Sequence, residues 1–194
     1  MTKNFSLSCD RNQQPIFEEL SMYFKDCRCV LEIGSGTGQH AVYFASRLPH
    51  LTWHTSDMID NHESIQAWIA EADLGNVILP VEFHFGKNDW PNLDVDGVFT
   101  ANTTHIMQRD EAELMMKTIA SKLKPGGVFC QYGPMNVNGR HTSESNQAFD
   151  QSLRERGYGG ICDVAELVDW AEGMTLIEQV SMPANNFLLV WSVK

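Results

Sequence analysis

Three glycines at alternate positions are the first residues of this sequence whose spacing indicates a ligand site. Residues 34–38 read Gly-Ser-Gly-Thr-Gly and follow the short apolar segment Cys29–Ile33. Glycine is required where the backbone takes a positive φ, or where a ligand approaches too closely for a Cβ. Dinucleotide-binding turns have the wider spacing Gly-x-Gly-x-x-Gly and hold a pyrophosphate at a helix N-terminus. The tighter spacing favours S-adenosylmethionine, which carries no phosphate, and the predicted binding residues are Gly34, Ser35, Gly36 and Gly38.

Two carboxylates flank this turn. Glu32 lies inside the apolar segment, where a carboxylate is costly to bury without a partner. That partner could be the positively charged α-amino group of the cofactor, or a structural salt bridge to Arg11 or Arg28. Asp57 ends the next apolar segment, where a carboxylate can accept from both ribose hydroxyls of a bound nucleoside. A helix-capping role for Asp57 is compatible with that contact, and a tight turn without any ligand is the alternative for the glycines.

Residues that follow the second and third apolar segments are candidates for contact with the adenine. Met58 could cover one face of the base, although methionine is more often ordinary core. Asp89 could accept from the adenine amino group, and Asn88 or the Trp90 backbone could contact the ring edge. The Trp90 ring could stack on the base or simply pack within its loop.

The candidate reaction residues are Asn102 and His105, which follow the apolar segment 95–101. Ligands of parallel sheets bind at the carboxyl edge of the strands, where this segment ends. Methyl transfer from a sulfonium is an in-line displacement that depends on alignment more than on acid–base help. We predict that Asn102 orients the acceptor or the sulfonium, and that His105 takes a proton from an ammonium or hydroxyl acceptor. A histidine hydrogen-bonded to the backbone at a strand end is the alternative for His105.

The elements that must position these residues alternate between apolar strands and helical patterns. Together they predict one α/β domain over residues 1–194, with a helical lid segment at 1–27, a Rossmann-like core at 28–194 and helices on both faces of a seven-stranded, mostly parallel sheet. The last two strands are joined only by residues 182–186, too short for a parallel crossover, so the last strand should run antiparallel. This arrangement is typical of class I methyltransferases and not of nicotinamide dehydrogenases.

The predicted bounds are as follows. Strands are expected at 29–33, 51–56, 81–85, 95–101, 128–132, 175–180 and 187–193, and helices at 15–27, 41–48, 63–72, 110–123, 145–156 and 163–171. Pro15 is expected in the first turn of the opening helix. Two capping boxes are expected, one from Asp110 and Glu113 and the other from Asp163 and Glu166.

Composition limits the partners. The 194 residues carry a formal net charge of −11, which disfavours nucleic acid and anionic membranes and leaves a small-molecule substrate as the expected partner. The five cysteines show no zinc or disulfide spacing, so we expect reduced thiols, no metal and a cytoplasmic location. Nothing in the sequence indicates the oligomeric state.

Several longer motifs resemble one family. They are Arg11-Asn12-x-x-Pro15-Ile16, residues 30–40, Ala101-Asn102-x-x-His105-Ile106, Ser143-x-Ser145-Asn146-x-x-Phe149-Asp150 and residues 182–186. The chain resembles the methyltransferase-like 26 family, also described as domain of unknown function 938. The resemblance implies a class I S-adenosylmethionine-dependent methyltransferase fold with a cofactor site. The stretch Leu7–Asp10 and Cys162 depart from the family pattern, which puts the choice of acceptor in doubt.

The sequence therefore predicts methyl transfer from S-adenosylmethionine to an unidentified, small-molecule acceptor. A cofactor-binding protein without turnover, which binds S-adenosylmethionine or S-adenosylhomocysteine, is one alternative. An NAD-dependent oxidoreductase is the other, and both the glycine spacing and the expected antiparallel strand disfavour it.

Overall fold

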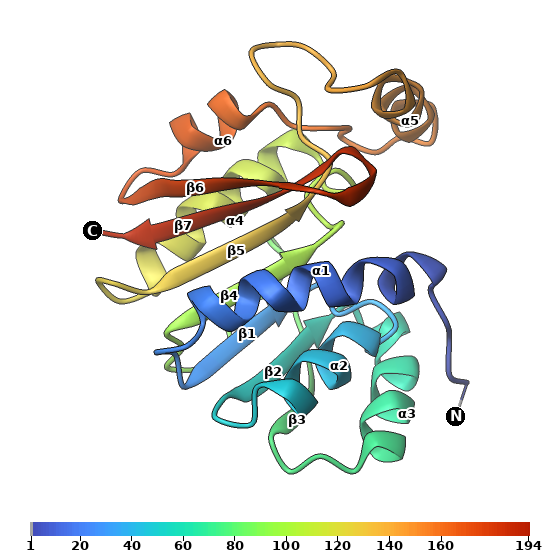
Figure 1. Ribbon diagram of the computed structural model, residues 1–194, viewed down its shortest axis with the longest axis vertical. Coiled ribbons are helices and arrows are strands. Elements are labelled where there is room, and N and C mark those ends of the chain that lie inside the picture. The colour runs from blue at the N-terminus through green and yellow to red at the C-terminus, as the bar shows by residue number, and fades with distance from the viewer. Residues whose placement is uncertain (1) are drawn as a thin grey trace. The chain divides into compact units, whose positions relative to one another are not determined.

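A computed structural model describes residues 2–194, so Met1 of the predicted lid segment lies outside the described residues. The chain divides into two compact units, Met1–Phe99 and Thr100–Lys194. Seven strands are hydrogen-bonded in the order β3-β2-β1-β4-β5-β7-β6 (Figure 1). Within the part of the chain that the structure describes, no helix has the length and apolarity needed to cross a membrane.

The first unit carries three parallel strands and three main helices. The strands are β1 (Cys29–Ile33), β2 (Thr52–Asp57) and β3 (Val77–Glu82), and the helices are α1 (Leu7–Tyr23), α2 (Gln39–Arg47) and α3 (His62–Ala72), with a short 3-10 helix at Ile59–Asn61. Ile33 pairs with Ser56, so β1 and β2 end at the same edge. Aromatic rings from α2, from two strands and from the C-cap of α1 fill the core, among them Phe24, Phe44, Trp53 and Phe99.

The second unit confirms the antiparallel last strand. Strand β4 (Gly97–Ala101) leads into it from the first unit, and β5 (Val128–Gly133), β6 (Met174–Met182) and β7 (Asn186–Val193) follow. Strand β7 runs antiparallel to both β5 and β6. The helices are α4 (Arg109–Lys122), α5 (Glu144–Glu155) and α6 (Val164–Trp170), and a 3-10 turn at Pro183–Asn185 joins β6 to β7.

The predicted start of the first helix is wrong. Helix α1 begins at Leu7, because Ser6 caps it and its hydroxyl accepts a hydrogen bond from the Cys9 amide at 3.3 Å. Pro15 therefore lies inside the helix and not in its first turn. Since proline has no amide hydrogen, the carbonyl of Arg11 loses its usual intrahelical partner.

Two other expectations are corrected by the structure. Strand β3 spans 77–82, not 81–85. Phe83 and Phe85, which suggested a strand by their alternate spacing, lie in the loop after β3 and pack on each other with ring centroids 4.7 Å apart. Helix α4 is capped by Gln108 and Glu111, not by Asp110 and Glu113. Glutamine is not a usual N-cap residue, so the motif was not visible in the sequence. The box of Asp163 and Glu166 at α6 is confirmed.

Candidate functional site

The glycine turn between β1 and α2 has the backbone that its sequence predicts. Gly34, Gly36 and Gly38 have φ values of +72°, +58° and +94°. A Cβ on Gly38 would lie 2.9 Å from the Cα of Ile65 in α3, whereas a Cβ on Gly36 would meet no atom within 4 Å. Gly38 therefore lets two helices approach each other, and Gly36 leaves one side of the turn open to a ligand.

Asp57 fastens this turn to the end of β2. One carboxylate oxygen accepts from the Gly36 amide at 2.7 Å. The other accepts from the Met58 amide at 2.7 Å and from the Asn61 side chain at 2.8 Å. A carboxylate has about four acceptor positions, so capacity remains for a further donor such as a hydroxyl. The N-cap of α3 is Asn61, so Asp57 does not cap that helix.

The buried carboxylate of Glu32 is hydrogen-bonded to a tryptophan on the neighbouring strand. This carboxylate is 1% exposed and accepts from the indole N–H of Trp53 at 3.1 Å. Burial raises the pKa of Glu32 to about 7, and the hydrogen bonds from Trp53 and Ser35 act in the opposite direction. Neither Arg11 nor Arg28, the bridging partners considered from the sequence, forms an ion pair with it among the described residues. Sequence reasoning missed Trp53, which no motif singles out.

The candidate adenine residues follow β2 and β3 in the chain, and the loop after β3 begins beside Asp57. Met58 is 49% exposed, and the Phe83 amide donates to the Asp57 carbonyl at 3.0 Å, so the loop after β3 leaves beside Asp57. On this loop Asn88 and Asp89 are exposed. Trp90 packs edge-to-face on Phe83, with centroids 5.8 Å apart, which is the packing role considered for it.

The N-terminal segment is fixed to the start of α2. The Ser6 amide donates to Gln39 Oε1 at 2.5 Å, and the Gln39 amide group donates back to the Ser6 carbonyl at 3.3 Å. His40 Nε2 forms a hydrogen bond with Asn12 Oδ1 at 2.7 Å. The sequence analysis did not predict these contacts, because it began this helix at residue 41, after Gln39 and His40.

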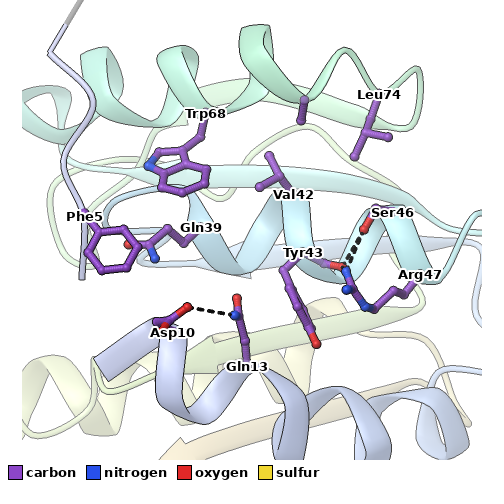
Figure 2. A pocket seen from close by; sticks show the side chains of 11 residues that line it. Phe5, Asp10, Gln13, Gln39, Val42, Tyr43, Ser46, Arg47, Trp68 and Leu74 are labelled. Atoms are coloured by element: carbon purple, nitrogen blue, oxygen red, sulfur yellow. Dashed lines mark hydrogen bonds between the residues drawn. The ribbon is translucent and has the colours of Figure 1, made fainter. Parts of the chain in front are cut away.

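A cavity of about 370 Å³ lies between α1, α2 and α3 of the first unit. Figure 2 shows Phe5, Gln39 and Trp68 at one end and Arg47 and Leu74 at the other. Its polar groups are largely engaged with one another: Gln13 donates to Asp10 at 3.3 Å, and Arg47 donates to the Ser46 hydroxyl at 3.1 Å.

In the second unit, Asn102 and His105 follow β4. Asn102 has a φ of +57°, an uncommon conformation outside glycine, and its amide donates to the Tyr132 carbonyl at 2.9 Å. His105 is 6% exposed, and its ring contacts Phe149 edge-on at 5.2 Å. Burial, with the nearby charge of Arg156, lowers the pKa of His105 to about 4. The imidazole is therefore neutral near pH 7 and a weak base.

The motif residues of α5 and the last turn also meet within this unit. The Asn146 side chain donates to the Thr142 hydroxyl and to the Asn185 carbonyl, both at 2.9 Å. Ala184 and Asn185 have φ values of +59° and +57°, so the turn between β6 and β7 is held in a strained form. Cys162 is buried, and this burial raises the pKa of its thiol.

Comparison with known proteins identifies the family and the fold. The model of the family described as "Protein of unknown function (DUF938)" matches residues 3–193. Methyltransferase nsrG of Aspergillus novofumigatus is 27% identical over 146 residues, which are 72% of this chain and 51% of nsrG. The chain thus spans about half the length of this curated relative.

Two solved structures share the fold. An O-methyltransferase family protein from Burkholderia thailandensis has a TM-score of 0.82 at 20% identity, over 94% of this chain and 56% of its own. Human N-acetylserotonin methyltransferase, solved in complex with SAM, has a TM-score of 0.76 at 14% identity. The match covers 93% of this chain and 54% of the human protein's chain. The predicted Rossmann-like class I methyltransferase fold is therefore confirmed.

Proposed function

The chain belongs to the DUF938 family of proteins of unknown function, and from that premise we propose that it transfers the methyl group of S-adenosylmethionine to an acceptor. The observation that carries the proposal is the glycine turn, which Asp57 holds through the Gly36 amide while the side of Gly36 stays open. A methyltransferase fold and a curated methyltransferase relative support it.

The turn offers groups that suit this cofactor. Glu32 and Ser35 would hold the amino-acid end, where the α-ammonium needs an acceptor. Asp57 would use its remaining acceptor capacity for a ribose hydroxyl, and Met58, Asn88, Asp89 and the backbone of Trp90 would contact the base. Bound S-adenosylmethionine supplies an electrophilic methyl group. Transfer of this methyl group would require the acceptor to be aligned with the sulfur–methyl bond, with the sulfur keeping the electron pair of that bond.

We propose a small molecule as the acceptor, because the net charge of −11 repels nucleic acid and anionic lipid. We also propose a cytoplasmic place of action, because the five cysteines are free thiols. Asn102 would orient the acceptor, and His105 in its neutral form would accept the proton that the acceptor loses. A His105 pKa of about 4 suits an acceptor that is already easily deprotonated, since a weak base removes only a weakly held proton.

One observation favours a second candidate function. His105 is buried and has a lowered pKa, which makes it a poorer proton acceptor. The candidate residues for cofactor binding are not affected by this burial. A protein that binds S-adenosylmethionine or S-adenosylhomocysteine without turnover would have this combination. An NAD-dependent oxidoreductase remains the less favoured alternative, because its pyrophosphate requires the wider glycine spacing.

Calorimetry with S-adenosylmethionine, S-adenosylhomocysteine and NAD tests the proposal on the wild type, on Asp57→Ala and on Asp60→Ala. Asp60 is an exposed carboxylate on the neighbouring turn, so it controls for the loss of charge. We expect both sulfur ligands to bind, NAD not to bind, and only Asp57→Ala to weaken binding. Tight NAD binding, or no binding of either sulfur ligand, would overturn the proposal. Methyl transfer to components of a metabolite extract then separates an enzyme from a binding protein.

A further inference from the structure

Gln39 and His40 are buried polar residues in the first turn of α2, and both bind the N-terminal segment. Gln39 exchanges two hydrogen bonds with the backbone of Ser6, and His40 binds the side chain of Asn12. Buried polar side chains are nearly always hydrogen-bonded, and here the partners come from a segment more than 25 positions earlier. These bonds join the first turns of α1 to the residues directly after the glycine turn.

The same segment reaches the glycine turn itself. The Cys9 thiol belongs to this segment; burial raises its pKa, and the charge of Glu32 raises it further. The Asn4 amide donates to the Ser64 hydroxyl at 3.0 Å, and that hydroxyl donates to the Thr37 carbonyl at 2.9 Å. Figure 2 shows Phe5 and the start of α1 beside Gln39. Residues 4–12 therefore lie against the turn on which the ligand would rest.

Hydrogen bonds, more than apolar packing, hold this segment. Its two large apolar side chains, Phe5 and Leu7, are 60% and 62% exposed. The later half of α1 is anchored differently, because Ile16 and Leu20 are completely buried. Pro15 lies between the two halves and removes one intrahelical hydrogen bond, which is the usual cause of a bend in a helix.

We propose that Gln39 and His40 are positioning residues that clamp residues 4–12 over the glycine turn, and that this clamp opens about Pro15 to admit and release the cofactor. The inference rests on the proposed function. A clamp made of a few neutral hydrogen bonds has a low opening cost, so exchange needs no unfolding of the buried half of α1.

The test measures association and dissociation rates of S-adenosylhomocysteine with the full chain, by stopped-flow tryptophan fluorescence. The double variant Asn12→Ala/Gln39→Ala removes the clamp, and we expect both rates to rise, with dissociation at least about fivefold faster. Pro15→Ala restores the helix hydrogen bond and should slow both rates. His50→Ala is the matched control, because His50 binds the Phe24 carbonyl at the other end of α1 and should leave both rates unchanged.

The outcomes are distinguishable. The clamp is overturned if the double variant releases S-adenosylhomocysteine at the wild-type rate, or if His50→Ala accelerates dissociation as much as the double variant does. Either result leaves the proposed function in place. A wild type that binds neither sulfur ligand overturns both. If the double variant does not fold, hydrogen exchange of the wild type decides: amides 6–12 must gain protection on addition of S-adenosylhomocysteine, and unchanged protection overturns the clamp.

Discussion

At the scale of single residues, the candidate cofactor site depends on a buried carboxylate whose partner comes from the neighbouring strand. Glu32 on β1 and Trp53 on β2 are joined inside the sheet, and Asp57 at the end of β2 fastens the turn that follows Glu32. A buried carboxylate keeps one orientation only if its hydrogen bonds fix it. Trp53 is thus as important to the geometry of the turn as the glycines are.

Trp53→Phe should weaken binding of S-adenosylhomocysteine by roughly 1–2 kcal/mol, because Glu32 loses the indole donor. Binding of 5′-methylthioadenosine, which lacks the amino-acid end, should be unchanged. Calorimetry with the two ligands measures the difference. Trp191→Phe is the control, since Trp191 is equally buried and donates to Gln131 at 3.2 Å in the second unit. Equal weakening of both ligands would indicate a general loss of structure and contradict the role of Trp53.

Stability should fall as the pH falls from about 6.5 to about 4. Burial lowers the pKa of His40 and of His105 to about 4 in the folded chain. As the pH falls below about 6.5, the unfolded chain therefore protonates these two histidines before the folded chain does, and unfolding is favoured. Glu32 acts in the opposite direction: its raised pKa contributes stability that is present below 4.5 and lost as the pH rises through about 7. Between 4.5 and 6.5 the two histidines outweigh this single carboxyl.

Urea unfolding at several pH values checks this expectation. His105→Gln should make the decline shallower by up to about 1.4 kcal/mol per pH unit, the value of one proton. His50→Gln, which replaces an exposed histidine, should leave the slope as in the wild type. An unchanged slope in His105→Gln would contradict the buried, neutral state of His105.

At the scale of elements, the spacing of apolar residues predicted the central turns of the helices but not the polar residues at which some of them begin. The apolar pattern of α1 begins near Ile16, whereas the helix begins at Leu7, because its first two turns are held by polar contacts with α2. Helix α4 likewise begins at a cap that common capping preferences do not indicate. Where the cap residue is a usual one, as Asp163 is for α6, the sequence prediction holds.

Asp163→Ala should lower the free energy of unfolding by about 1–3 kcal/mol. The Asp163 carboxylate caps α6 through the Ala165 amide at 2.9 Å and also accepts from the Gly139 amide at 2.6 Å. Asp110→Ala should cost less than about 0.5 kcal/mol, because Asp110 is exposed and is not the N-cap of α4. Urea unfolding of both variants compares them, and equal losses would contradict the assignment of the caps.

At the scale of the whole molecule, the candidate cofactor residues all lie within residues 1–99, and Asn102 and His105 lie within residues 100–194. Each unit has its own buried core and its own share of the candidate residues. The order of the strands places β1 between β2 and β4, away from both edges of the sheet, which explains why its residues are apolar except for Glu32.

The acidic charge leads to a prediction at this scale. With a net charge of −11, the protein should not bind duplex DNA or duplex RNA at physiological salt. Neither nucleic acid should displace bound S-adenosylhomocysteine. Fluorescence anisotropy with labelled duplexes measures this. Binding that weakens steeply with added salt would contradict the proposal of a small-molecule acceptor.

The sequence by itself determined the fold class, the glycine turn, the approximate place of six strands and the antiparallel last strand. These features depend on local periodicity, on the conformational freedom of glycine and on the length of one connection, which can be read along the chain. Only the tertiary structure decided that Trp53 is the partner of Glu32, that Asp57 holds the Gly36 amide, and that Gln39 and His40 hold the N-terminal segment. Such contacts join residues far apart in the chain, and a buried polar group takes whichever partner the packing brings within reach.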